Sequence, residues 1–143
     1  MTAEKLLTFL IVILCLAGVV ISGMALGEHY NTKPSPCSIN DRWDCGIVNH
    51  SPYAMLHGVP VADIGIVGYF LLGILALKRM YKTMLVLAIP ALAFSLYLAH
   101  IEKDVLGVWC LYCAISLGMI SLIALLLVVT VTTRFIRRPK LYL

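Results

Sequence analysis

The segment 109–113, Trp-Cys-Leu-Tyr-Cys, has the residue types and spacing of a redox pair, and it precedes a long apolar run. Residues three apart lie on one face of a helix, where Cys110 and Cys113 can form a disulfide with little rearrangement. A helix that begins near Leu106 would place both cysteines in its first turns. Unpaired backbone N–H groups there favour a thiolate, most strongly at Cys110. The sequence therefore predicts a dithiol held at a membrane surface.

A second pair, Cys37 and Cys45, encloses seven residues of a polar stretch. This spacing is too wide for one helical turn and suits a mobile loop closed by a disulfide. The fifth cysteine, Cys15, lies within an apolar run, and we expect it to pack as a small hydrophobic residue. If the two pairs face an oxidising compartment, we expect disulfides or exchange partners. If they face a reducing compartment, we expect a metal site instead.

The composition is that of an integral membrane protein in a lipid bilayer. The chain has 143 residues, of which 62% are hydrophobic, and its mean hydropathy is +0.98. Soluble domains contain only about 45–50% apolar residues. Charged residues make up 13% and fall almost wholly between the apolar runs, which leaves no basic surface for binding nucleic acid.

Four apolar runs predict an all-α membrane protein, a bundle of four transmembrane helices that forms a single domain over residues 1–143. Each run is close to the ~20 residues that cross a bilayer. A cleavable signal peptide is the alternative for the first run, but the apolar core of such a peptide is usually only ~7–15 residues long. We therefore expect an uncleaved span. The predicted spans cover about residues 6–26, 59–77, 84–101 and 105–131.

The polar stretch 27–58 is predicted to be a cysteine-bearing loop that ends in a short interfacial helix. Ser51 is a suitable N-cap for this helix, Pro52 suits its first position, and Gly58 suits its end. The apolar side of the helix would rest on the membrane interface, either as a lid over what lies beneath or as a plain anchor.

Asp63 is an acidic residue near the start of the second apolar run. Acids in membrane helices usually face the bundle interior or a polar cavity. Asp63 would then hold a proton or donate a hydrogen bond to a substrate carbonyl. The other interpretation places Asp63 at the headgroup level or at the start of the helix as a cap.

The basic residues predict the orientation, because cytoplasmic loops carry the excess of Lys and Arg. One side of the membrane would hold eight of them and the other side three. We therefore expect both termini in the cytoplasm and all four paired cysteines at the outer face. The eight are Lys5, Lys78, Arg79, Lys82, Arg134, Arg137, Arg138 and Lys140, and the three are Lys33, Arg42 and Lys103.

Taken together, these residues resemble the vitamin K epoxide reductase family in its bacterial form, which is similar in function to DsbB-type disulfide-generating enzymes. The resemblance extends over four spans in the order of the family. The matching positions are Cys37, Cys45-Gly46, Ser51-Pro52-Tyr53, His57-Gly58-Val59-Pro60, Gly65 and the segment 109–113.

The resemblance implies a four-helix bundle around a membrane quinone of the ubiquinone or menaquinone type. Cys110 and Cys113 would be the active-site pair, and Cys37 and Cys45 the shuttle pair. Cys37 would exchange with a thioredoxin-fold partner, Cys45 would attack Cys110, and Cys113 would reduce the quinone. Ser51, Trp109 and Tyr112 are the further candidates at this site, with Ser51 matching a loop serine of the family. For Trp109 and Tyr112, membership of an interfacial aromatic belt is the alternative.

Two features depart from the family pattern. Val61 stands where many relatives carry asparagine, with Asp63 as a candidate substitute, and Leu117 stands where a tyrosine is expected beyond Cys113. Many bacterial members also carry a fused thioredoxin domain, and here the partner would act in trans. The expected setting is a bacterial cytoplasmic membrane, with the cysteine pairs on the periplasmic or extracellular side.

Three other interpretations compete with quinone-dependent thiol oxidation. The first is a quinone-epoxide reductase, which would reduce a quinone epoxide instead. A claudin-like structural tetraspan protein would explain Trp43 and the loop cysteines, but the short turn 101–106 offers little adhesion surface. A zinc site of four thiolates also uses C-x-x-C spacing. An oxidising location argues against it, and the histidines lack paired metal-ligand spacing, so we predict no metal.

Overall fold

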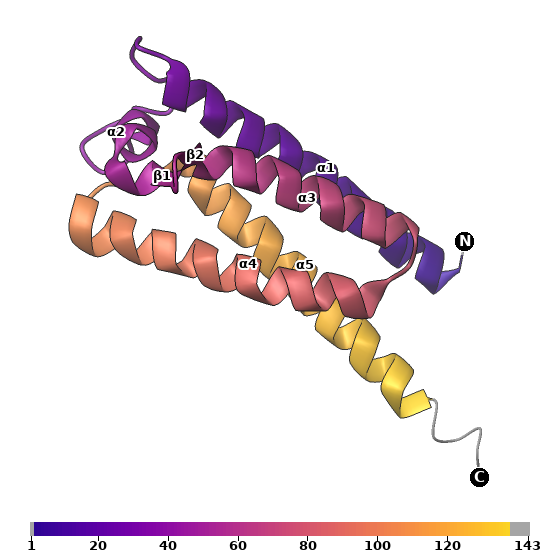
Figure 1. Cartoon of the computed structure of the whole chain (residues 1–143). Coiled ribbons are helices and arrows are strands. Elements are labelled where there is room, and N and C mark those ends of the chain that lie inside the picture. Colours follow the sequence, from indigo (N-terminus) through magenta and orange to yellow (C-terminus); the bar gives the residue numbers. More distant parts are fainter. Residues whose placement is uncertain (1, 138–143) are drawn as a thin grey trace.

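The computed structural model describes residues 2–137. Within this range, four long helices lie side by side and run alternately in opposite directions along the bundle (Figure 1). They are α1 (Ala3–Tyr30), α3 (Val61–Leu77), α4 (Tyr81–Ile101) and α5 (Leu111–Arg137).

Three segments of the described chain are helical, long and apolar enough to cross a membrane: Ala3–Tyr30, Tyr81–Leu106 and Leu111–Arg137. The fourth apolar helix, Val61–Leu77, is shorter. Large apolar side chains such as Phe70, Val86 and Leu125 lie exposed on the outside of the bundle. Such an apolar exterior belongs in lipid, because soluble proteins rarely expose contiguous apolar surface of this extent.

Close packing of α1 on α3 depends on small residues. A Cβ atom added at Gly18 would overlap the ring of Tyr69, and one added at Gly65 would lie 2.8 Å from the Ser22 hydroxyl. Because the glycines lack side chains, the two backbones can approach closely. The core between the helices is apolar, and its fully buried side chains include Ile11, Met84, Ile123 and Leu127.

Polar contacts join three segments at the end of the bundle that holds the N-terminus (Figure 1). Glu4 forms ion pairs with Arg79 and Arg134. The Arg134 guanidinium lies 4.6 Å above the centre of the Tyr81 ring. The basic residues predicted for one face therefore gather at this end, although Arg138 and Lys140 lie outside the described residues.

The opposite end carries the short elements, and here the predicted interfacial helix is present only as a single turn that ends before Gly58. Ser51 precedes a single 3-10 turn, η1 (Pro52–Ala54), which is followed by the strands β1 (Met55–Leu56) and β2 (Val59–Pro60). The strands pair antiparallel. His57 and Gly58 connect them with positive φ angles of 49° and 82°, a backbone conformation typical of a tight hairpin.

The predicted start of the last span is wrong. The chain continues from α4 into a π-helical turn, η2 (Glu102–Leu106), and α5 begins only at Leu111. The turn ends at Gly107, which has a left-handed φ of 70°. Glycine suits this position because the left-handed conformation is costly for residues with a Cβ. α1 extends beyond both of its predicted bounds, and α4 begins three residues earlier than predicted. α3 begins two residues later than predicted and ends where predicted. Residues 27–30, predicted as loop, belong to α1.

Candidate redox site

The loop that carries Cys37 and Cys45 is anchored to the segment that precedes α5. The Trp109 N–H donates to the Arg42 carbonyl at 2.7 Å, and the Asp44 N–H donates to the Trp109 carbonyl at 3.0 Å. The rings of Trp43 and Trp109 lie 6.4 Å apart. These contacts restrain the Cys45 end of the loop, which was predicted to be mobile, and bring it against Cys110.

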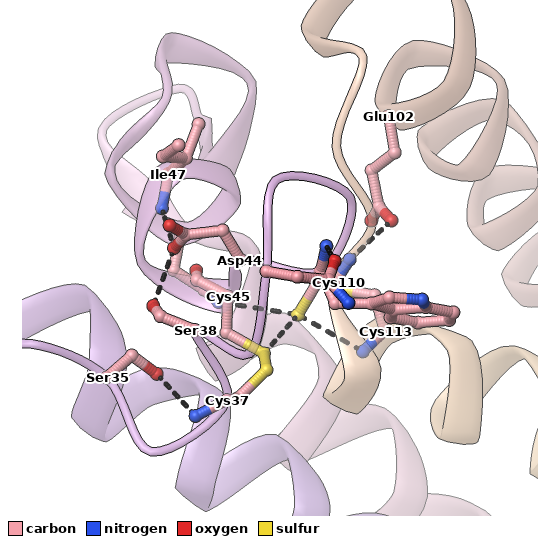
Figure 2. Close-up of a disulfide and its surroundings, with 12 residues drawn as sticks. Ser35, Cys37, Ser38, Asp44, Cys45, Ile47, Glu102, Cys110 and Cys113 are labelled. Carbon is pink, nitrogen blue, oxygen red and sulfur yellow. Dashed lines mark hydrogen bonds between the residues drawn. A yellow bond between two sulfur atoms is a disulfide. The ribbon is translucent and has the colours of Figure 1, made fainter.

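Cys37 and Cys45 form a disulfide, with their Cα atoms 5.5 Å apart. Cys45 is the first residue of the short helix α2 (Cys45–His50), and the Asp44 side chain caps this helix by accepting from the Ile47 N–H at 3.1 Å. The Cys37 N–H donates to the Ser35 hydroxyl at 3.1 Å. Both cysteines are buried, so local hydrogen bonds and packing fix the positions of their sulfurs (Figure 2).

The two cysteine pairs meet at Cys110, as Figure 2 shows. Its sulfur lies 3.5 Å from the Cys45 sulfur, and it accepts the Cys113 N–H at 3.4 Å. Cys110 directly precedes α5, and its carbonyl accepts the Ala114 N–H at 2.9 Å. It is therefore the N-cap residue, and Cys113 lies in the first turn. Thiol–disulfide exchange requires such contact between a free sulfur and a disulfide sulfur.

The surroundings of Cys110 favour its thiolate. The Cys113 thiol is the main cause, because its hydrogen bond to the Cys110 sulfur lowers the pKa of Cys110. Burial opposes this effect, while the Cys113 N–H and the Asn49 side chain support it. The Asn49 amide nitrogen lies 3.6 Å from the sulfur. A helix N-terminus acts in the same direction, since its free N–H groups attract negative charge.

Behind Cys113 lies a cavity of about 280 Å³ between the four long helices. Its walls are mainly apolar, which suits the ring and tail of a lipid-soluble molecule. Three of the predicted site residues line the cavity: Ser51, Tyr112 and Cys113. Further polar groups reach it from several helices: Ser22, Asn49, Tyr53, Tyr69, Ser95, Glu102 and Ser116.

Two predicted contact residues lie elsewhere. Asp63 is in the first turn of α3, and neither it nor Trp109 is among the residues that line the cavity. Trp109 instead holds the cysteine loop through its backbone. Ser51 lines the cavity, but its hydroxyl donates to the Val48 carbonyl at 2.7 Å.

Two residues of the site were missed by sequence reasoning. Asn49 contacts Cys110, and it also donates to the Cys45 carbonyl at 2.8 Å. Glu102 was assigned to an ordinary turn, yet its side chain is buried and accepts the Cys110 N–H at 3.0 Å. An acid only eight residues before the first cysteine of the pair is the signal that would have found it.

The family model described as "Vitamin K epoxide reductase family" matches residues 9–131. The chain belongs to the vitamin K epoxide reductase family. The protein is therefore a membrane oxidoreductase that uses cysteines. No curated protein matches the chain in a sequence comparison.

Members of the vitamin K epoxide reductase family use quinones, and the residues around the cavity fit such a molecule. The cavity combines apolar walls with a few polar groups, and the Cys113 thiol is part of its lining. Cys113, Tyr112 and Ser51 would hold the quinone together with side chains from the other helices. When bound, a quinone supplies an acceptor for two electrons and two protons.

Proposed function

We propose that this protein is a quinone-linked thiol oxidase that reoxidises an extracytoplasmic thioredoxin-fold protein acting in trans. The observation that carries the proposal is the position of the Cys45 sulfur, which is bonded to Cys37 and lies 3.5 Å from Cys110. One sulfur thus stands between the loop pair and the pair beside the cavity. Electrons from a soluble dithiol can cross this junction by exchange alone.

The exchange begins at Cys37. A partner thiolate attacks the Cys37 sulfur, and Cys45 leaves as a thiolate. The partner's second thiol then releases Cys37 and completes the partner's disulfide. The site thereby takes up two electrons from one dithiol, which emerges oxidised.

The second exchange takes place between the pairs. The Cys45 thiolate attacks Cys110 of a Cys110–Cys113 disulfide, so Cys113 leaves as a thiolate. Cys37 then attacks Cys45 and releases Cys110. The outcome is a Cys37–Cys45 disulfide beside two free cysteines, which is the arrangement in Figure 2. The Cys110 and Cys113 sulfurs close again when their two electrons pass to a quinone in the cavity.

Four spans and an outward-facing site complete the proposal. The 17 residues of α3 extend ~26 Å at 1.5 Å per residue, near the lower limit for a transmembrane helix. The basic end of the bundle would face the cytoplasm of a bacterial cell, with both termini. The sulfur pairs at the opposite end would meet the oxidising compartment.

Thiol trapping in membranes tests the proposal. A reduced periplasmic thioredoxin-fold protein is added to membranes that contain or lack quinone, and its thiols are alkylated and counted. Cys110→Ser and Cys113→Ser should leave this partner reduced, and quinone depletion should do the same. Cys15→Ser is the matched control and should oxidise the partner as the unmodified protein does. Oxidation that persists in Cys113→Ser, or without quinone, would rule the proposal out.

A further inference from the structure

Glu102 has an unusual position for a carboxylic acid. Its side chain is only 3% exposed, although it belongs to the turn that continues a transmembrane helix. A buried charge in such a place is costly unless it is paired or has a function. The salt bridges of residues 2–137 do not include Glu102. Its burial is therefore not explained by an ion pair.

The carboxyl group joins the dithiol to the cavity. One oxygen accepts the Cys110 N–H at 3.0 Å, and Glu102 lines the cavity together with Cys113, the second cysteine of the pair. Figure 2 shows the side chain descending from its helix toward the two cysteines. Among described residues, the other titratable side chains lining the cavity are the phenols of Tyr53, Tyr69 and Tyr112.

Resting on the proposed function, we infer that Glu102 transfers the proton of the Cys113 thiol into the cavity. Oxidation of two thiols to a disulfide releases two electrons and two protons, and a quinone requires both electrons and both protons. In a mainly apolar site, a side chain beside the thiol can carry a proton between sulfur and acceptor. Glu102 is the one carboxylic acid that lines the cavity within residues 2–137.

Cys113 leaves the exchange as a thiolate, takes up one of the two protons of the partner dithiol, and gives it to the Glu102 carboxylate. The other proton passes to water. The Cys110 thiolate then bonds to the Cys113 sulfur as two electrons leave the sulfur pair for the quinone. Glu102 then gives its proton to one oxygen of the reduced quinone, and water supplies the second. Glu102 returns to the carboxylate and the sulfurs to the disulfide.

A purely structural role makes a different prediction, because Glu102 also holds the Cys110 N–H. In Glu102→Gln, the amide oxygen can still accept this hydrogen bond, whereas the side chain no longer carries a transferable proton. Glu102→Asp keeps the acid. The titratable groups beside Glu102 are Cys110 and Cys113, while Asp104 on its own turn is exposed and pairs with His100. Asp104→Asn is therefore the matched control.

The first measurement needs no quinone. The reduction potential of the Cys110–Cys113 couple is determined in dithiothreitol buffers across a pH series. If Glu102 exchanges a proton with the dithiol, the plot of reduction potential against pH should show an extra inflection in the unmodified protein and in Asp104→Asn. This inflection should be absent in Glu102→Gln. A wild-type curve that lacks the extra inflection, or one that Glu102→Gln reproduces, would overturn the inference.

The second measurement follows closure of the Cys110–Cys113 disulfide after mixing with a short-chain quinone. Glu102→Gln should slow this step by about 10²-fold or more, as for loss of a general acid–base group. Glu102→Asp should recover at least part of the rate, and Asp104→Asn should match the unmodified protein. A wild-type rate in Glu102→Gln would contradict proton transfer. Failure of the unmodified protein to react with quinone would refute the proposed function instead, and the potential series would still decide on Glu102.

Discussion

The sulfur of Cys110 lies 3.5 Å from the sulfur of Cys45, although 64 residues separate them along the chain. Cys45 is at the same time disulfide-bonded to Cys37. Backbone hydrogen bonds from Asp44 and Trp109 maintain this arrangement. The contact between the two pairs is thus a property of the fold and does not depend on a chance encounter of a flexible loop.

The Asn49 amide should influence the ionisation of Cys110. Its hydrogen bond supports the thiolate, and hydrogen bonds to charged groups are worth about 1.5–3 kcal/mol. We expect Asn49→Ala to raise the pH midpoint of Cys110 ionisation, because the variant removes one of the hydrogen bonds that support the thiolate. The measurement is a pH titration of the ultraviolet thiolate absorbance, from which the absorbance of Cys110→Ser is subtracted. An unchanged midpoint in Asn49→Ala would contradict the assigned hydrogen bond.

The same lowered pKa predicts the sign of a pH effect on stability. Folding lowers the pKa of Cys110 below its ordinary value of 9.0, so its thiolate stabilises the reduced protein fully above that value. This stabilisation is lost as the pH falls through the lowered pKa. Thermal unfolding of the unmodified protein and Cys110→Ser should therefore differ increasingly as the pH rises toward 9.0. A difference that shrinks over this range would be inconsistent with a thiolate-favouring site.

Asp44 should stabilise the Cys45 end of the loop. Its carboxylate accepts from the Ile47 N–H at 3.1 Å and from the Ser38 hydroxyl at 2.8 Å. Asp44→Ala should cost about 1 kcal/mol, the usual contribution of an N-cap, and should speed reduction of the Cys37–Cys45 disulfide by dithiothreitol. Asp44→Asn is the control, since asparagine caps equally well. Equal reduction rates for both variants would show that the cap does not position Cys45.

Packing at Gly18 should support the cavity. An added Cβ would overlap the Tyr69 ring, and this ring's hydroxyl donates to the Ser116 carbonyl at 2.9 Å. We expect Gly18→Ala to destabilise the protein by about 1–3 kcal/mol, the usual cost of overpacking. At Gly23, nothing lies within 4 Å of an added Cβ, so Gly23→Ala is the matched control. Thermal unfolding in detergent measures both, and similar melting temperatures would refute the packing argument.

Sequence reasoning identified the apolar helices and both cysteine pairs, because these patterns are local. Hydrophobic run length predicts helices long enough to cross a membrane, and C-x-x-C spacing predicts a dithiol wherever the fold places it. The hairpin at His57 and Gly58 was missed because serine, proline and glycine there also fit a capped helix. Its positive φ angles are what distinguish the two structures.

The parts that escaped prediction depend on tertiary contacts. Glu102 and Asn49 reach Cys110 only because η2 and α2 converge on the residue that precedes α5. The late start of α5 follows from Gly107 and from the pairing of Trp109 with the cysteine loop. These contacts join segments far apart in the chain, and spacing within one segment does not reveal them. Asp63 was predicted to contact the quinone because an acidic residue in a membrane helix is energetically costly, but it does not line the cavity.

Direct exchange between Cys45 and Cys110 is tested most directly by forming their disulfide in isolation. In a Cys15→Ser background, Cys37→Ser with Cys113→Ser leaves Cys45 and Cys110 as the remaining thiols. Its matched control, Cys37→Ser with Cys110→Ser, leaves Cys45 and Cys113. Mild oxidation followed by peptide mass spectrometry measures cross-linking. We predict a Cys45–Cys110 disulfide that forms at least about tenfold faster than the control cross-link, because proximity sets the rate. Equal rates, or no Cys45–Cys110 disulfide, would contradict the account.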